Sequence, residues 1–314
     1  MSDLSKIYGL NGDIGDTFYS LPAADLNQLG SPAVAIVGAP IATPYPGFDL
    51  FSADAPNALR AGMAFDAPFI SHHDYDFGGS LLEDQFGQIV DCGDLPTSES
   101  DFAANRNMIS TAVRQILEAG AKPLVIGGDD SIPTPVFQAF ADRNKRYTIL
   151  QIDAHIDWRD EVNNERWGLS STMRRASEME HIERIVQVGM RSPGSARRGE
   201  VEVAEAWGAT IITAQSLFRN GVDSVLEHIP ADSNVLITFD CDVLDSGIMP
   251  AVMSPSPGGL TYWQTLELIQ GVAQKATLCG FNCVEFMPSR DTNGLAAQTA
   301  GRIRLNAAAE MARK

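Results

Sequence analysis

In three segments of the sequence, an apolar run is followed directly by residues that commonly bind metal ions. They read LVIGGDDSIP, TILQIDAHID and VLITFDCDVLD. Carboxylate and imidazole groups in such numbers suit divalent cations. The candidate ligands are Asp129, Asp130, Asp153, His155, Asp157, Asp240, Asp242 and Asp245.

The spacing of these residues predicts which side chains share a face. Residues two apart on an extended chain point the same way, so Asp153 and His155 form one pair and Asp240 and Asp242 another. Asp157 can join the first pair if the chain curls beyond the strand. Carboxylates gathered in this way would repel one another unless cations neutralised them. The pattern therefore predicts a site for two divalent metal ions, whereas Asp129 taken alone is typical of a turn residue.

Short apolar runs that alternate with helical patterns must position these residues. The runs are apolar on both faces, which is typical of a parallel sheet covered by helices. We predict an α/β fold, a three-layer α/β/α sandwich with a mostly parallel sheet. The expected strands are Ala33–Pro40, Pro123–Gly128, Tyr147–Asp153, Arg184–Met190, Thr210–Thr213, Val235–Asp240 and Cys279–Phe286. The expected helices are Asp101–Ala119, Thr134–Arg143, Arg198–Trp207, Ser216–His228 and Thr261–Ala276.

Composition limits the class of protein. The chain has 314 residues, 44% of them hydrophobic, and we expect a single domain over residues 1–314 with an N-terminal extension over 1–30 that makes an oligomer contact. A net charge of −17 argues against nucleic acid and anionic membranes as partners. The start of the sequence lacks a signal-peptide pattern and no run is long enough to cross a membrane, so we expect a cytoplasmic protein. The four cysteines are expected to be free thiols.

Taken together, the motifs resemble those of the ureohydrolase family, which includes arginase and agmatinase. GGDDSI stands where that family has GGDHS, DAHID matches its D-A-H-x-D element, and FDCDVLDSGIMPAVMSPSPGGLT matches its long segment ending in PGGLT. The similarity runs from about Gly38 to Arg304. The segment HIDWRDEVNNERWGLSSTMRRASEM is similar to the guanidine hydrolase and two-subunit metformin hydrolase branch.

The resemblance implies an arginase-like fold, a trimer or hexamer, and a site with two divalent ions, nickel or manganese. It implies hydrolysis of a C–N bond in a small cationic guanidine or biguanide substrate, with a urea-type product and an amine. Glu285 would hold the substrate cation, Asp157 would relay a proton to the leaving nitrogen, and Ser170 and Ser171 would contact the substrate. The implied metal ligands are Asp130, Asp153, His155, Asp157, Asp240 and Asp242.

Asp130 departs from the family pattern, because relatives have a histidine ligand at this position. The extra negative charge would hold bound water at a higher pKa, and a carboxylate suits nickel less well than imidazole does. One metal position is therefore expected to be weak or empty. Two hypotheses remain open: a catalytic subunit, or a non-catalytic sister subunit that stabilises a paralogous catalytic subunit in a hetero-oligomer. Phosphoryl transfer is disfavoured by the absence of a glycine-rich phosphate loop, and a related deacetylase would not explain PGGLT or Glu285.

Overall fold

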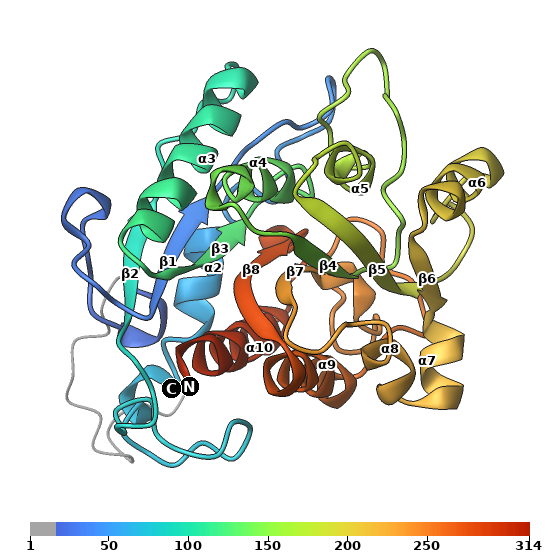
Figure 1. Cartoon of the computed structure of the whole chain (residues 1–314). Helices are drawn as coiled ribbons and strands as arrows, with labels where there is room; N and C mark the ends of the chain where they lie inside the picture. The colour runs from blue at the N-terminus through green and yellow to red at the C-terminus, as the bar shows by residue number, and fades with distance from the viewer. Residues whose placement is uncertain (1–16) are drawn as a thin grey trace.

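A single eight-stranded sheet forms the centre of the molecule (Figure 1). The computed structural model describes residues 17–314, so residues 1–16 of the expected N-terminal extension lie outside the described residues. The strand order is β2-β1-β3-β8-β7-β4-β5-β6, and all neighbouring strands pair in parallel. The strands are β1 (Val34–Ala39), β2 (Ile89–Asp94), β3 (Lys122–Gly127), β4 (Tyr147–Ile152), β5 (Ile182–Met190), β6 (Thr210–Thr213), β7 (Asn234–Asp240) and β8 (Thr277–Val284).

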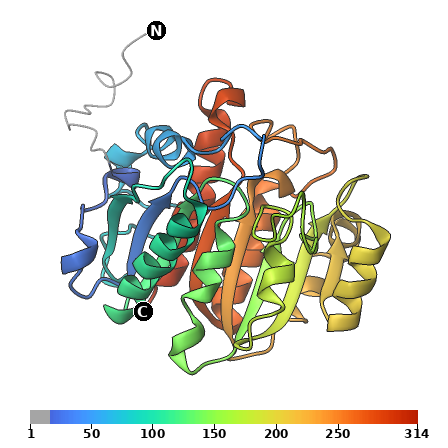
Figure 2. The same ribbon diagram turned by 90° about the horizontal axis from the view of Figure 1, so that it is seen from above.

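Helices cover both faces of the sheet, so the predicted three-layer α/β/α sandwich is confirmed (Figures 1 and 2). On one face lie α3 (Phe102–Glu118), α4 (Pro133–Gln138), α5 (Thr172–Ala176) and α6 (Arg198–Trp207). On the other lie α2 (Ala55–Gly62), α7 (Ala214–Asn220), α8 (Asp223–Leu226), α9 (Tyr262–Lys275) and α10 (Leu295–Ala312). Short 3₁₀ turns occur at Phe18–Ser20, Leu26–Gln28, Ala67–Phe69, Ala141–Arg143, Cys241–Val243 and Pro288–Arg290. Each face packs its own hydrophobic core, because the strands are apolar on both sides.

Strand β2 and helices α2, α5 and α10 were not expected from the sequence, and α5 is only five residues long. Strand β2 carries two aspartates in six residues, so it lacks an apolar run. Helix α10 is buried nearly all round, which removes the one-sided stripe that identifies a surface helix. Helix α2 lies in the segment 44–79, which has no clear pattern in the sequence.

Two predicted helices are shorter than expected. The segment Ser216–His228 is divided between α7 and α8, since Gly221 takes a left-handed φ of 79° between them. Helix α4 ends at Gln138, and a separate 3₁₀ turn follows it. All four cysteines are free, as predicted.

A buried ion-pair group fastens β2 at the edge of the sheet. Arg60 of α2 contacts Asp91 at 2.8 Å and Asp94 at 2.5 Å, and the Phe18 N–H donates to Asp91 at 2.7 Å. Arg60 is 8% exposed and the Asp91 side chain is fully buried. These charges therefore compensate one another inside the protein, and they explain why an acidic segment can serve as a strand.

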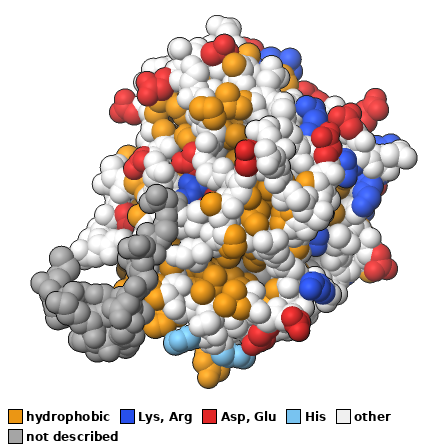
Figure 3. Space-filling model, turned by 90° about the vertical axis from the view of Figure 1, so that its left-hand side faces the viewer, with side chains coloured by type: hydrophobic (Ala, Val, Ile, Leu, Met, Phe, Trp, Pro, Cys, Tyr) orange, Lys and Arg blue, Asp and Glu red, His pale blue; other side chains and the backbone are white. Residues whose placement is uncertain are grey.

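The surface on the β2 side of the molecule carries hydrophobic patches between polar side chains (Figure 3). Large exposed hydrophobic residues elsewhere on the described chain include Phe218, which is 81% exposed, and Trp263, which is 58% exposed. Within residues 17–314, every helix is too short or too polar to cross a membrane.

Candidate metal centre

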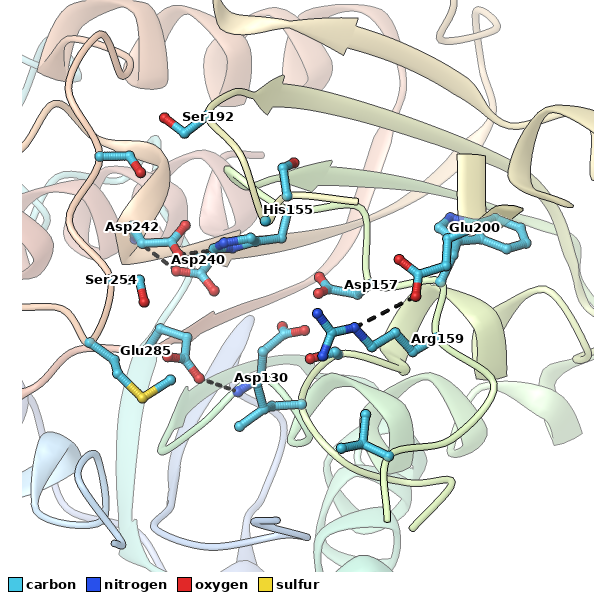
Figure 4. Close-up of a pocket in the computed structure, with 18 of the residues that line it drawn as sticks. Asp130, His155, Asp157, Arg159, Ser192, Glu200, Asp240, Asp242, Ser254 and Glu285 are labelled. Carbon is cyan, nitrogen blue, oxygen red and sulfur yellow. Dashed lines mark hydrogen bonds and ion pairs between the residues drawn. The ribbon is translucent and has the colours of Figure 1, made fainter. Parts of the chain in front are cut away.

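The candidate ligands lie at the carboxyl ends of four adjacent strands, β3, β8, β7 and β4. Asp130 follows β3, Glu285 follows β8, Asp240 ends β7 and Asp153 follows β4. In parallel sheets this edge is where ligands bind, because loops from neighbouring strands converge there. A cavity of about 310 Å³ opens at this edge, and its walls include Asp130, Asp240 and Glu285 (Figure 4).

Two groups of possible metal-binding side chains share one residue. The first consists of Asp153, His155 and Asp242, and the second consists of Asp130, Asp153 and Asp157. Within each group, one donor atom from every residue lies within 4.8 Å of the others. Because Asp153 belongs to both, the arrangement has the form of two neighbouring cation positions joined by one carboxylate.

Asp240 lies beside these groups without belonging to either of them. Its Oδ1 accepts a 2.7 Å hydrogen bond from the backbone N–H of Asp242. Its side chain also lines the cavity and is nearly fully buried. The structure therefore brings all six predicted metal ligands to one cavity edge, with five of them in the two groups.

His155 is ion-paired inside the first group. Its Nδ1 lies 3.0 Å from Asp242 Oδ2 and 3.5 Å from Asp153 Oδ1. Burial alone would lower the pKa of His155, but hydrogen bonds and charges from Asp153 and Asp242 outweigh burial and raise it to about 12. The pKa of Asp242 is lowered, since the contact with His155 outweighs burial.

The second group carries uncompensated acid groups. Burial, followed by the neighbouring carboxylates, raises the pKa values of Asp130 and Asp157 well above their ordinary range. Asp130 Oδ2 is buried without any hydrogen-bond partner. A buried carboxylate oxygen without a partner, beside two further carboxylates, fits the donor set of a hard divalent cation.

The backbone is strained at two residues to which the resemblance gives roles in the reaction. Asp157 has a φ of 50° and Glu285 a φ of 64°, both in the left-handed region. Such a conformation is costly for residues other than glycine and tends to occur at functional sites. Glu285 Oε1 accepts a 2.9 Å hydrogen bond from the Asp130 N–H, and this bond ties the loop after β8 to the loop after β3.

Asp129 and Asp245 have structural roles. Asp129 Oδ1 accepts hydrogen bonds from the backbone N–H and the hydroxyl of Ser131, as expected for a turn residue. The Asp245 carboxylate accepts from the N–H groups of Gly247 at 2.9 Å and Gly258 at 2.8 Å. Asp245 therefore holds the PGGL loop and does not point into either ligand group.

The two candidate substrate-binding serines are placed differently. Ser170 lines the cavity, and its N–H donates to the Tyr45 hydroxyl at 3.2 Å. Ser171 is fully buried behind the wall, and its N–H donates to the carbonyl of Gly168 at 2.9 Å. Ser170 therefore borders the cavity in which a ligand would bind, whereas Ser171 does not line it, because neighbouring residues in a turn point in different directions.

Sequence analysis missed three charged residues that line the same cavity, Arg159, Arg191 and Glu200. Arg159 lies two residues after Asp157, and its Nε is 3.6 Å from Glu200 Oε1 (Figure 4). Glu200 lies in the first turn of α6, where its other oxygen accepts from the Arg197 N–H at 2.7 Å. The position of Arg159 two residues after DAHID could have indicated it, whereas a helix-capping glutamate has no distinguishing pattern in the sequence.

Comparison with known proteins agrees with this geometry. The model of the arginase family matches residues 32–310, which is most of the chain. The chain belongs to the arginase family. A guanidinobutyrase of Pseudomonas aeruginosa is 26% identical over 251 residues, which are 77% of this chain and 78% of the relative. A mitochondrial arginase of Medicago truncatula is 29% identical over 92% of this chain and 85% of the relative.

The arginase-family fold is also found in solved structures. The proclavaminate amidino hydrolase of Streptomyces clavuligerus superposes with a TM-score of 0.84 at 23% identity, covering 95% of this chain and 97% of that chain. At this identity the likeness concerns the fold. Membership of the arginase family and the cluster of acid groups at the carboxyl edge of the sheet agree with each other.

Proposed function

We propose that this chain is a subunit of a metal-dependent hydrolase that cleaves a C–N bond of a guanidine or biguanide substrate, as metformin hydrolase does. The products would be a urea-type compound and an amine. The observation that carries the proposal is the position of Glu285 on the cavity wall, beside the two ligand groups that share Asp153. Relatives named guanidinobutyrase and agmatinase support guanidino compounds as the substrate class.

The charge and position of each residue suit it either to metal binding or to substrate binding. Two divalent ions, nickel or manganese, would be held by Asp130, Asp153, His155, Asp157, Asp240 and Asp242. When bound, such ions lower the pKa of a water so that hydroxide is available at neutral pH. Glu285 would pair with the planar cation and hold its carbon over the metal centre.

Asp157 is suited to carry a proton to the leaving nitrogen. Its side chain borders the cavity and belongs to the second ligand group, so it lies where both the metal centre and a substrate can be reached. Ser170, which also borders the cavity, would contact the substrate. Arg159 and Glu200 would contact the part of the substrate that lies away from the reacting carbon.

Metal content and product release test the proposal together. The purified chain, loaded with Ni²⁺ or Mn²⁺, is incubated with guanidine, a guanidino acid, agmatine and a dimethylated biguanide. Urea-type product and amine are then measured. Release from at least one compound, with two ions bound per chain, supports the proposal. No release by the chain, either alone or mixed with a paralogous subunit, contradicts it.

A second candidate function is that of a non-catalytic sister subunit in a hetero-oligomer, and Asp130 is the observation that favours it. A carboxylate in place of the family histidine adds a negative charge beside Asp153 and Asp157. A sister subunit would bind one ion or none and release no product alone. It would, however, raise the activity of its paralogue in a trimer or hexamer. Mixing the two purified chains and measuring activity and mass by light scattering distinguishes the two functions.

A further inference from the structure

A row of buried polar side chains crosses the sheet directly beneath the metal centre. Strand register aligns Gln151 of β4 with Gln187 of β5 on one side and with Thr238 of β7 on the other. Thr238 in turn pairs with Asn282 of β8. All four are at most 1% exposed. Polar groups at the centre of an apolar sheet are costly unless their hydrogen bonds are complete, so their partners indicate what they do.

Gln151 is the member of this row that contacts the predicted ligands. Asp153 follows it by two residues, so the two side chains lie on the same face of the strand. Gln151 Nε2 donates to Asp153 Oδ2 at 2.7 Å and to Asp157 Oδ2 at 2.6 Å. Both amide hydrogens are thus used on carboxylates of the group that contains Asp130.

Gln187 fixes Gln151 from the neighbouring strand. Gln187 Nε2 donates to Gln151 Oε1 and, at 2.8 Å, to the carbonyl of Ile156. Trp158 Nε1 donates to Gln187 Oε1 at 2.9 Å. Both glutamine side chains therefore have their donors and acceptors matched.

The indole determines which way both amides face. An indole N–H can only donate, so Gln187 must present its oxygen to Trp158 and its NH₂ group to Gln151. Gln151 must then present its own NH₂ group to the carboxylates. A reversed amide at Gln151 would set its oxygen against two carboxylate oxygens, which would repel it.

We propose that Gln151, oriented by Gln187 and Trp158, is a positioning residue that sets the carboxylates of Asp153 and Asp157 for the cation bound beside Asp130. The inference rests on the proposed function, since it needs a cation at that position. The amide holds one oxygen of each carboxylate. Asp157 Oδ1 is left for the ion, and Asp153 Oδ1 faces the His155 side of the site, where the backbone N–H of His155 donates to it at 2.7 Å. Outer groups that orient ligands in this way commonly contribute ten- to a hundredfold to metal affinity.

Isothermal titration of the metal-free full-length chain with Mn²⁺, and separately with Ni²⁺, tests the inference. Gln151→Met keeps the volume but removes both donors. It is expected to weaken one of two binding events about tenfold or more. Trp158→Phe keeps a smaller aromatic ring and removes the indole donor, so it is expected to weaken the same event by a smaller factor. Because Trp158→Phe is the milder change, it gives the result if Gln151→Met does not fold.

Trp207→Phe is the matched control. Trp207 packs against Trp158 at 6.0 Å between ring centroids, but its indole donates to the backbone carbonyl of Ser177 at 3.0 Å. This variant is expected to bind metal like the wild type. Thermal unfolding of each metal-free variant separates a loss of stability from a loss of affinity.

The outcomes distinguish the inference from the proposed function. If the wild type binds two ions and both Gln151→Met and Trp158→Phe bind them equally tightly, the inference is overturned and the proposed function stands. If the affinity falls equally in Trp207→Phe, the effect belongs to packing and the inference is again overturned. If the wild type binds neither ion, the proposed function is overturned and the inference with it.

Discussion

The backbone N–H of Asp130 donates a 2.9 Å hydrogen bond to Oε1 of Glu285. Asp130, which by the motif resemblance stands in place of a histidine, is thereby joined to the carboxylate proposed to hold the substrate. This bond comes from the backbone, so it does not depend on which side chain stands at position 130. A substitution there can change metal binding without releasing Glu285.

Restoring a histidine should strengthen the metal site. Asp130→His removes one of the carboxylates that repel Asp153 and Asp157 and supplies an imidazole that suits nickel. We expect Ni²⁺ to bind roughly tenfold more tightly at this position, with activity raised in parallel. Metal analysis after dialysis and urea release are the measurements.

Asp129→Asn is the matched control for that change, because Asp129 accepts from Ser131 and belongs to neither ligand group. It should leave metal content unaltered. Equal metal content in the wild type and Asp130→His would contradict the view that position 130 weakens the site.

Glu285→Gln should separate substrate binding from metal binding. The amide oxygen can still accept from the Asp130 N–H, but the negative charge that faces the substrate cation is lost. We expect kcat/KM to fall on the order of 100-fold with two metal ions retained. Unchanged kinetics in the metal-loaded variant would remove Glu285 from the proposed mechanism.

The stabilising effect of metal should grow with pH. Burial, followed by nearby carboxylates, raises the pKa values of Asp130, Asp157 and Asp240 in the folded chain. The metal-free folded state therefore keeps protons that the unfolded chain releases above about pH 4, and its stability falls as pH rises past that value. A metal ion displaces those protons.

The measurement is the difference in Tm between metal-loaded and metal-free protein from pH 5 to pH 8. The difference should widen steadily over this range. A constant difference would mean that these carboxyl groups are already ionised in the metal-free fold.

Breaking the ion pair at the sheet edge should destabilise the fold without touching the site. Arg60→Met leaves Asp91 buried without its cation, and we expect a loss of about 3–5 kcal/mol in the free energy of unfolding. Arg198→Met, in an exposed pair with Glu202, should change it by less than about 1 kcal/mol. Urea denaturation of both variants checks the contrast.

The sequence was sufficient for the parts of the site that follow strand geometry. The spacing of Asp153 and His155 predicted their shared face, and the positions after the strands predicted the cluster. It did not indicate Gln151 and Gln187, because a glutamine within an apolar run acquires meaning only when strand register places a second one beside it. Arg159 and Glu200 meet only because a loop and a helix end converge in space. Strand β2 could not be predicted, because Asp91 interrupts its apolar residues. Only the structure shows that Arg60 neutralises this carboxylate.

The left-handed backbone at Asp157 and Glu285 affects how this cavity can be studied by mutagenesis. Alanine at either position would lose the carboxylate while retaining an unfavourable conformation worth ~1–3 kcal/mol. Inactive proteins from an alanine scan would therefore mix misfolding with lost chemistry. Asparagine tolerates this conformation well, so Asp157→Asn isolates the missing charge. Glycine would relieve the backbone strain. A glycine variant that is more stable but inactive would show that the functional side chain lowers the stability of the protein at this position.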